Sequence, residues 1–131
     1  YVDQALGALQ DRFRLILVTK GDMFDQERKL AASGLADYFA AIEIVGTKDA
    51  DTYRRIFARH TEGPAHTLMA GNSLRSDILP PLEAGAYAVY VPHDLTWSYE
   101  RADEPENHPR YARIAHLGEL ESAIAGFEAK V

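Results

Sequence analysis

Apolar and polar residues form blocks along this chain that predict strands and helices in alternation. Four short, mostly apolar runs predict strands, at residues 15–18, 41–45, 67–70 and 87–91, and the continuous run at 15–18 fits a strand buried on both faces. Stretches with helical periodicity lie before and between these runs, at residues 2–12, 23–33 and 49–60. Strands and helices that alternate are typical of an α/β protein, so we expect a parallel sheet with helices on both faces.

The helical segment 49–60 has the clearest amphipathic pattern. Its inward-facing positions recur at helical spacing: Tyr53, Ile56, Phe57 and His60. Gly34 follows the segment 23–33 and is expected to end that helix. The segment 93–110 is rich in charge and proline, which predicts a long excursion. The remaining expected elements are a helical turn at 35–39, an edge strand at 113–116 and a closing helix at 119–130.

The composition is that of a globular domain rather than of a nucleic-acid-binding or membrane protein. The chain has 131 residues, of which 47% are hydrophobic and 26% charged, and this is enough to bury a core in one compact domain. Its net charge of −6 argues against a nucleic-acid partner, which would require a basic face. No apolar run approaches the ~20 residues that span a bilayer, and the sequence has no cysteine. We therefore expect a cytoplasmic protein with no membrane contact.

Polar groups follow the first predicted strand, where Thr19, Lys20 and Gly21 come directly after residues 15–18. Ligands of open α/β sheets bind at the carboxyl ends of strands. The Thr19 hydroxyl and the backbone N–H groups of Lys20 and Gly21 are therefore expected to bind phosphate oxygens, as oriented amides in a turn do.

Two further strand ends carry suitable side chains. Lys48 follows the strand at 41–45, and its ammonium is suited to neutralise a phosphoryl group and a carboxylate beside it. The strand at 67–70 runs into Gly-Asn-Ser-Leu-Arg-Ser-Asp, which contains Asn72 and Asp77. Their oxygen atoms are donors of the hard type that Mg²⁺ prefers.

These three motifs, in this order and strand context, resemble the second, third and fourth motifs of the haloacid dehalogenase-like (HAD) phosphohydrolases. Thr19 matches the Ser or Thr of the second motif, and Lys48 matches the lysine of the third. Asn72 and Asp77 match the fourth motif, in which Gly-Asp-Ser is commoner than Gly-Asn-Ser. The resemblance covers about residues 15–92 and implies a Rossmann-like HAD core. Because Asn72 would bind metal through a neutral carbonyl, it also implies a weaker metal site that depends more on Asp77.

The resemblance implies a Mg²⁺-dependent phosphatase that acts on a small phosphorylated metabolite. In the family, an aspartate of the first motif, Asp-x-Asp-x-Thr, attacks phosphorus and forms an aspartyl-phosphate, while Mg²⁺ offsets the repulsion between carboxylate and phosphate. Thr19 and Lys48 would hold the transferring group, and Asn72 and Asp77 would hold the metal. Haloacid dehalogenases share the fold but attack carbon without a metal; Asp77 and the Gly21 turn favour the phosphatase.

The first motif does not occur in this sequence, so we expect residues 1–131 to be part of a longer HAD core and to be inactive alone. In the family, the first-motif strand lies between the strands that precede Thr19 and Asn72. Its absence leaves two open apolar edges, which favour self-association or pairing with the missing N-terminal segment. The segment between Thr19 and Lys48 already holds a helix and a strand, so any cap domain is expected upstream.

The motif residues also have simpler interpretations. Thr19 is suited to an ordinary strand end and Lys48 to a solvated surface. Asp77 is a good N-cap for a helix over residues 78–84, with Pro80 in its first turn, and this role is compatible with metal binding.

One apparent first motif has a better explanation. Asp49-Ala50-Asp51-Thr52 is similar to Asp-x-Asp-x-Thr, but it does not directly follow a strand and it comes after Thr19. These aspartates are expected to stabilise the N-terminus of the helix over 49–60. Two other classes of function remain open, namely a non-catalytic Rossmann or flavodoxin-like binding domain and a HAD pseudoenzyme.

Overall fold

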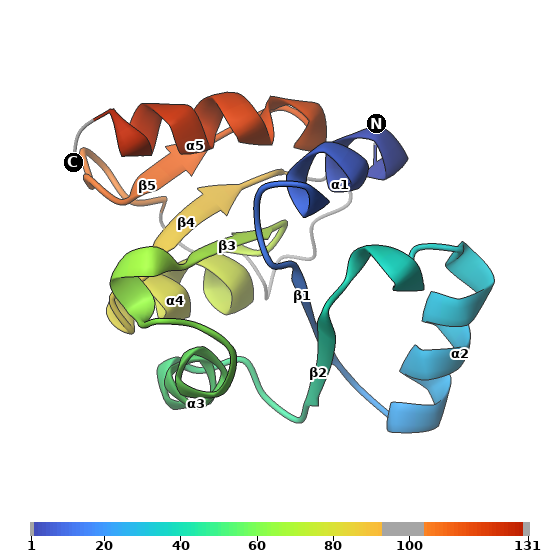
Figure 1. The fold of residues 1–131 in the computed structure, drawn as a ribbon. Helices are drawn as coiled ribbons and strands as arrows, with labels where there is room; N and C mark the ends of the chain where they lie inside the picture. The colour runs from blue at the N-terminus through green and yellow to red at the C-terminus, as the bar shows by residue number, and fades with distance from the viewer. Residues whose placement is uncertain (1, 93–103, 130–131) are drawn as a thin grey trace. The chain divides into compact units, whose positions relative to one another are not determined.

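The computed structural model describes residues 2–92 and 104–129, which form two compact units (Figure 1). Unit 1 is Tyr1–Thr47 and unit 2 is Lys48–Val131. In the segments that the structure describes, no helix combines the length and the apolar character needed to cross a membrane.

Unit 1 is built on a two-stranded parallel sheet. Its elements are α1 (Val2–Gln10), β1 (Ile16–Lys20), α2 (Met23–Ser33), a 3-10 turn (Ala36–Tyr38) and β2 (Ala41–Val45). β1 pairs with β2 so that Ile16 lies opposite Ala41. The connection between parallel strands must return to the start of the sheet, and α2 provides this crossover.

α2 begins and ends where its sequence predicts. The Asp22 carboxylate accepts the N–H of Asp25 at 3.0 Å, which makes Asp22 the N-cap. Gly34 follows the helix with φ at 75° and donates its N–H to the Ala31 carbonyl. This left-handed C-cap confirms the expectation for Gly34.

Unit 2 is built on a three-stranded parallel sheet in the order β3-β4-β5. Its elements are α3 (Ala50–His60), a 3-10 turn (Pro64–His66), β3 (Leu68–Gly71), a π-helical turn (Leu74–Ile78), α4 (Leu79–Glu83), β4 (Tyr87–Tyr90), β5 (Tyr111–Arg113), a 3-10 turn (Leu117–Glu119) and α5 (Leu120–Glu128). β4 has a strand on each side, and its residues Ala88, Val89 and Tyr90 are buried.

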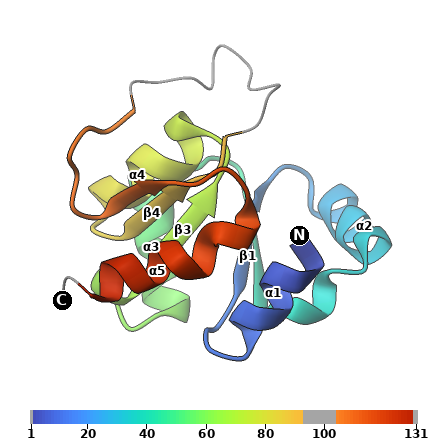
Figure 2. The same cartoon turned by 90° about the horizontal axis from the view of Figure 1, so that it is seen from above.

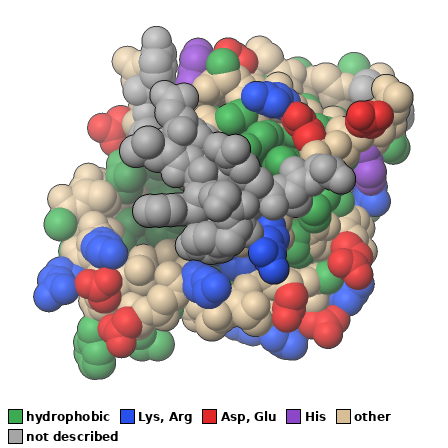
Figure 3. Space-filling model, turned by 180° about the vertical axis from the view of Figure 1, so that it is seen from behind, with side chains coloured by type: hydrophobic (Ala, Val, Ile, Leu, Met, Phe, Trp, Pro, Cys, Tyr) green, Lys and Arg blue, Asp and Glu red, His purple; other side chains and the backbone are tan. Residues whose placement is uncertain are grey.

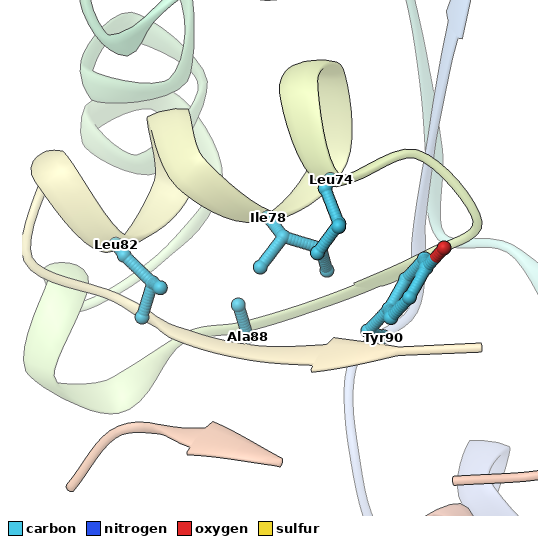
Figure 4. Close-up of a cluster of buried hydrophobic side chains, with 5 residues drawn as sticks. All are labelled: Leu74, Ile78, Leu82, Ala88 and Tyr90. Carbon is cyan, nitrogen blue, oxygen red and sulfur yellow. The ribbon is translucent and has the colours of Figure 1, made fainter. Parts of the chain in front are cut away.

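Helices cover both faces of β4, as the sequence predicts. Successive strand residues point to opposite faces, so Tyr87 and Ala88 face different layers. On one face the Tyr87 ring packs on Phe127 of α5, with ring centroids 4.9 Å apart, and α5 lies along the sheet in both ribbon views (Figures 1 and 2). On the other face, the π-helical turn, α4 and β4 share one buried cluster: Leu74, Ile78, Leu82, Ala88 and Tyr90 (Figure 4).

The burial of β1 differs from the expectation of a strand buried on both faces, and β3 is only half-buried as well. Among the described residues, β1 pairs only with β2, and β3 pairs only with β4. The residues of β1 are half-buried apart from an exposed Lys20, and those of β3 are half-buried throughout. A strand with one partner keeps one edge of its backbone open, which accounts for the lower burial.

Two element boundaries also differ from their predictions. The edge strand expected at 113–116 starts at Tyr111 and ends at Arg113, although the Ile114 N–H still bonds to the Tyr90 carbonyl at 2.9 Å. The closing helix ends at Glu128 rather than at residue 130, which is outside the described residues. Most of the excursion predicted over 93–110 is also outside them.

Charged side chains on the helix surfaces pair with neighbours on the same helix. Arg54 contacts Asp51 at 2.6 Å on α3, and Arg28 contacts Asp25 at 2.9 Å on α2. Lys and Arg side chains lie among Asp and Glu side chains across the face drawn in Figure 3. Exposed pairs of this kind contribute about 0–1 kcal/mol each, so burial rather than surface charge stabilises the fold.

Gly34→Ala is expected to lower the free energy of unfolding by about 1 kcal/mol, because a Cβ at positive φ is strained even in open space. Gly126→Ala is the matched control, since a Cβ there also meets open space but lies within α5, where Ala should raise stability by up to about 1 kcal/mol. Urea unfolding of the full-length protein measures both changes. Shifts of the same sign would contradict the left-handed assignment of Gly34.

Candidate functional site

The carboxylate of Asp77 is the centre of the polar contacts at the carboxyl end of β3. Its side chain is only 6% exposed. Oδ1 lies 2.8 Å from Lys48 Nζ, while Oδ2 accepts the backbone N–H groups of Asn72 at 3.1 Å and Ser73 at 3.2 Å. A buried charge is tolerated only when it is paired and hydrogen-bonded in this way. The structure thus brings Lys48 and Asp77, two of the sequence-derived site residues, into direct contact.

The last residue of β3, Gly71, provides the space for this carboxylate. A Cβ built on Gly71 would overlap Cβ and Oδ2 of Asp77. Any side chain at position 71 would therefore displace the carboxylate from the ammonium of Lys48 and from the two backbone amides. This close approach explains why glycine precedes Asn72 in the motif.

The expectation that Asp77 caps a helix over residues 78–84 is wrong. The helical turn begins earlier, and Ser73 is its N-cap: the Ser73 hydroxyl accepts the Ser76 N–H at 3.2 Å. Asp77 lies inside the π-helical turn and donates its own N–H to the Ser73 carbonyl at 2.8 Å. Its carboxylate folds back to the amides that precede the turn, so it is a ligand of the loop rather than a cap of α4.

The start of α3 fixes the position of Lys48. Asp49 is the N-cap of this helix and accepts the Thr52 N–H at 2.8 Å, as the sequence predicts. This hydrogen bond from Thr52 holds the pKa of the Asp49 carboxyl below its ordinary value. Asp49 caps the helix, and Asp51 pairs with Arg54 on its surface. The structure therefore supports the helix-terminus interpretation of these aspartates. Lys48 is thereby held directly before the N-cap of α3.

The residues predicted to bind phosphate from unit 1 have their own hydrogen bonds. Thr19 Oγ1 donates to Gln26 Oε1 at 2.9 Å, and the Gly21 N–H donates to the Val45 carbonyl at 3.2 Å. The predicted phosphate contact of the Gly21 amide therefore competes with a bond to the neighbouring strand. Gly21 has φ at 140°, and a Cβ there would lie 2.9 Å from Gln26 Nε2. Lys20, the last residue of β1, is exposed.

The donors predicted for Mg²⁺ fit that ion in chemical type. The described residues contain no group of three His, Cys, Asp or Glu side chains that could hold a metal. Asn72 has an exposed side chain with a neutral carbonyl oxygen, and Asp77 adds a carboxylate. Mg²⁺ typically takes one or two protein carboxylates and completes its shell with waters and substrate phosphates, so a small set of oxygen donors is compatible with it.

Two residues that the sequence analysis did not assign to the site contact its groups. Gln26 accepts the Thr19 hydroxyl, and the Tyr53 hydroxyl donates to the Ser76 carbonyl, next to Asp77, at 2.8 Å. Burial, and to a lesser extent the charge of Asp77, raise the pKa of Tyr53. Helical periodicity placed Tyr53 in the core correctly but gave no information on the partner of its hydroxyl.

The chain is similar to several solved structures of hydrolases. No family model and no curated protein matches the chain. A haloacid dehalogenase-like family hydrolase from Xanthomonas campestris is 33% identical, with a TM-score of 0.87 over 98% of this chain and 54% of that one. The HAD-hydrolase YfnB from Bacillus subtilis, solved with magnesium, is 27% identical, with a TM-score of 0.77 over 93% of this chain and 54% of that one. A HAD phosphatase from Thermococcus onnurineus is 26% identical, with a TM-score of 0.74 over 94% of this chain and 56% of that one. The chain thus spans about half the length of these structures.

Lys48→Met is expected to lower the free energy of unfolding by about 3 kcal/mol, because it leaves the buried carboxylate of Asp77 without its ammonium. The double variant Lys48→Met, Asp77→Asn removes both charges and should recover about 1–2 kcal/mol of this loss. Chemical unfolding of the single and double variants measures the coupling. Strictly additive losses would show that the two side chains do not interact in solution.

Gly71→Ala is expected to destabilise the protein by about 2–3 kcal/mol, because the new methyl group overlaps the Asp77 carboxylate. Gly46→Ala is the matched control, since a Cβ there meets open space, and it should change stability by no more than about 0.5 kcal/mol. The midpoint of urea unfolding measures both variants. Equal effects would contradict the close packing of Gly71 on Asp77.

Proposed function

We propose that this chain, which belongs to the haloacid dehalogenase-like hydrolase superfamily, is part of a Mg²⁺-dependent phosphatase that acts on small phosphorylated metabolites. The observation that carries the proposal is the buried ion pair between Lys48 and Asp77 at the carboxyl end of β3. An ammonium held at a strand end is suited to bind phosphoryl oxygens, since charge-assisted hydrogen bonds to phosphate are strong.

Lys48 would act on the transferring phosphoryl group directly. An ammonium has three N–H donors, and Asp77 accepts one of them at 2.8 Å. This bond fixes the direction of the side chain, so its other donors can meet the negative charge that develops on the phosphoryl oxygens. Stabilisation of that charge by a pre-positioned donor is the largest contribution that such a site makes to the rate.

The order of the motifs along the chain is the reason to assign a phosphate-binding role to Thr19, Lys20 and Gly21. The Thr19 hydroxyl and the backbone N–H of Lys20 would bind phosphoryl oxygens, and the absence of a side chain on Gly21 would let the phosphate approach the backbone. In the described structure the Thr19 hydroxyl bonds to Gln26, so substrate binding would exchange this partner for a phosphoryl oxygen.

Asn72 and Asp77 would hold Mg²⁺, which supplies charge neutralisation of the phosphoryl group when it is bound. A similar hydrolase was solved with magnesium, which supports the choice of this ion. The resemblance implies that the nucleophile is an aspartate of an Asp-x-Asp-x-Thr motif, which these 131 residues do not contain. The proposed activity therefore concerns the longer protein, and residues 1–131 alone are expected to be inactive.

One observation favours a second reaction, the metal-independent hydrolysis of 2-haloacids. Both carboxylate oxygens of Asp77 already have partners within the protein, and Asn72 replaces the commoner aspartate of the motif. A site balanced in this way does not require a cation to compensate its charge. The two reactions differ in the product that they release, which is phosphate or halide, so a direct assay separates them.

The full-length protein is expected to hydrolyse p-nitrophenyl phosphate with Mg²⁺ and to lose this activity in EDTA. Lys48→Met should lower kcat/KM about 10²- to 10³-fold, because it removes a donor to the developing charge. Lys29→Met is the matched control, since Lys29 is exposed and pairs with the surface residue Asp25, and it should leave kcat/KM unchanged within twofold. Halide release from 2-chloropropionate without phosphate release would favour the second reaction. Activity with neither substrate class would contradict both.

A further inference from the structure

The backbone of the π-helical turn has a carbonyl that the helix itself cannot satisfy. In an α-helix the carbonyl of Ser76 would accept the N–H of residue 80, and in a π-helix it would accept the N–H of residue 81. Both residues are prolines and have no N–H. The Leu79 N–H is directed to the Leu74 carbonyl instead. The donor for the Ser76 carbonyl must therefore come from outside the backbone of this helix.

The hydroxyl of Tyr53 provides such a donor. It donates to the Ser76 carbonyl at 2.8 Å from α3, across 23 positions of sequence. Tyr53 is fully buried, and its ring lies beside Phe57 with centroids 5.9 Å apart. A buried ring has little freedom to move its hydroxyl, so the position of α3 fixes the position of the Ser76 peptide group.

Lys48 and Tyr53 come from one short segment and contact adjacent residues of the π-helical turn. Lys48 binds the carboxylate of Asp77, and Tyr53 binds the carbonyl of Ser76, the residue directly before it. Asp49 lies between them and caps the helix that carries Tyr53, so Lys48 directly precedes a capped helix start. On the other side, Leu74 and Ile78 point toward β4, so the turn is held from both sides (Figure 4).

We propose that Tyr53 is a positioning residue of the Lys48–Asp77 site, which replaces through its hydroxyl the backbone donors that Pro80 and Pro81 lack. The proposal rests on the proposed function for its effect on activity, but its structural part does not depend on it. Without the hydroxyl, the peptide group before Asp77 loses a partner, and the carboxylate shifts relative to Lys48. A displacement of about 1 Å in a catalytic group can lower the rate about 10²-fold.

Packing alone is the competing explanation for a tyrosine at this buried position. A phenylalanine would fill the same space, so packing predicts that Tyr53→Phe has no local effect. A positioning role predicts an effect at residues 72–77 in particular. The variant therefore separates the two explanations without a large change in volume.

The first test is residue-resolved amide hydrogen exchange by NMR on the full-length protein. Tyr53→Phe should accelerate exchange at Asn72 and Ser73, whose N–H groups bond to Asp77, about tenfold. The amide of Ala88, which bonds to the Arg110 carbonyl at 2.9 Å, reports global opening and should change less than twofold. Tyr87→Phe is the matched control and should leave Asn72 and Ser73 unchanged. Equal acceleration at Asn72, Ser73 and Ala88, or none at Asn72 and Ser73, would overturn the proposal.

The second test restores the missing backbone donor. Pro80→Ala returns an N–H four residues after Ser76, and Pro80 is only half-buried, so little packing is lost. In this background, Tyr53→Phe should accelerate exchange at Asn72 and Ser73 less than threefold. If the effect of Tyr53→Phe were the same with proline or alanine at position 80, the Ser76 carbonyl would not be its target and the proposal would fail.

Steady-state hydrolysis of p-nitrophenyl phosphate gives the third readout. Tyr53→Phe should lower kcat at least tenfold and change KM less than twofold, because the substrate-binding groups remain while the geometry of Lys48 and Asp77 relaxes. An unchanged kcat in an active protein would overturn the positioning role. A wild-type protein with no hydrolysis would instead refute the proposed function, and the exchange data would still decide whether Tyr53 orders the turn.

Discussion

The burial of the Asp77 carboxylate is the constraint on which the rest of unit 2 depends. A charge that is 6% exposed requires an ammonium and hydrogen-bond donors within contact distance. Its partners come from two parts of the chain: Lys48 directly before the N-cap of α3, and Asn72 and Ser73 in the loop after β3. Gly71 contributes the space that a side chain would occupy. One carboxylate therefore connects a strand end, a helix start and a π-helical turn.

The sheet explains why these groups meet at one place. β3 and β4 run in parallel, and the chain leaves β3 at its carboxyl end into the turn that carries Asp77. The same turn and α4 bury Leu74, Ile78 and Leu82 against β4, so apolar packing on one side holds a polar arrangement on the other. The polar groups thus gather at the carboxyl end of the strand, which is where open α/β sheets bind their ligands.

Elements with strong local signals were predictable from the sequence, and contacts between distant residues were only partly so. The bounds of Met23–Ser33 and Ala41–Val45 agree with their predictions because capping residues define the helix and a short, mostly apolar run defines the strand. Ser73 and Asp77 are both good N-cap residues one turn apart, so the sequence alone does not distinguish them, and the structure shows that Ser73 is the cap. The bond from Tyr53 to the turn is long-range and has no periodic signal. Lys48 was predicted from its position after a strand and from its match to the third motif of the family.

The two prolines after the π-helical turn also have an evolutionary consequence. If the Tyr53 hydroxyl replaces the missing backbone donors, it is required only while residues 80 and 81 cannot donate an N–H. A relative that carries another residue at position 80 regains a backbone donor for the Ser76 carbonyl. Such a relative can carry phenylalanine or an aliphatic residue at position 53. Substitutions at these two positions should thus be accepted in pairs, and the order in which they arise matters: the proline must be lost before the hydroxyl.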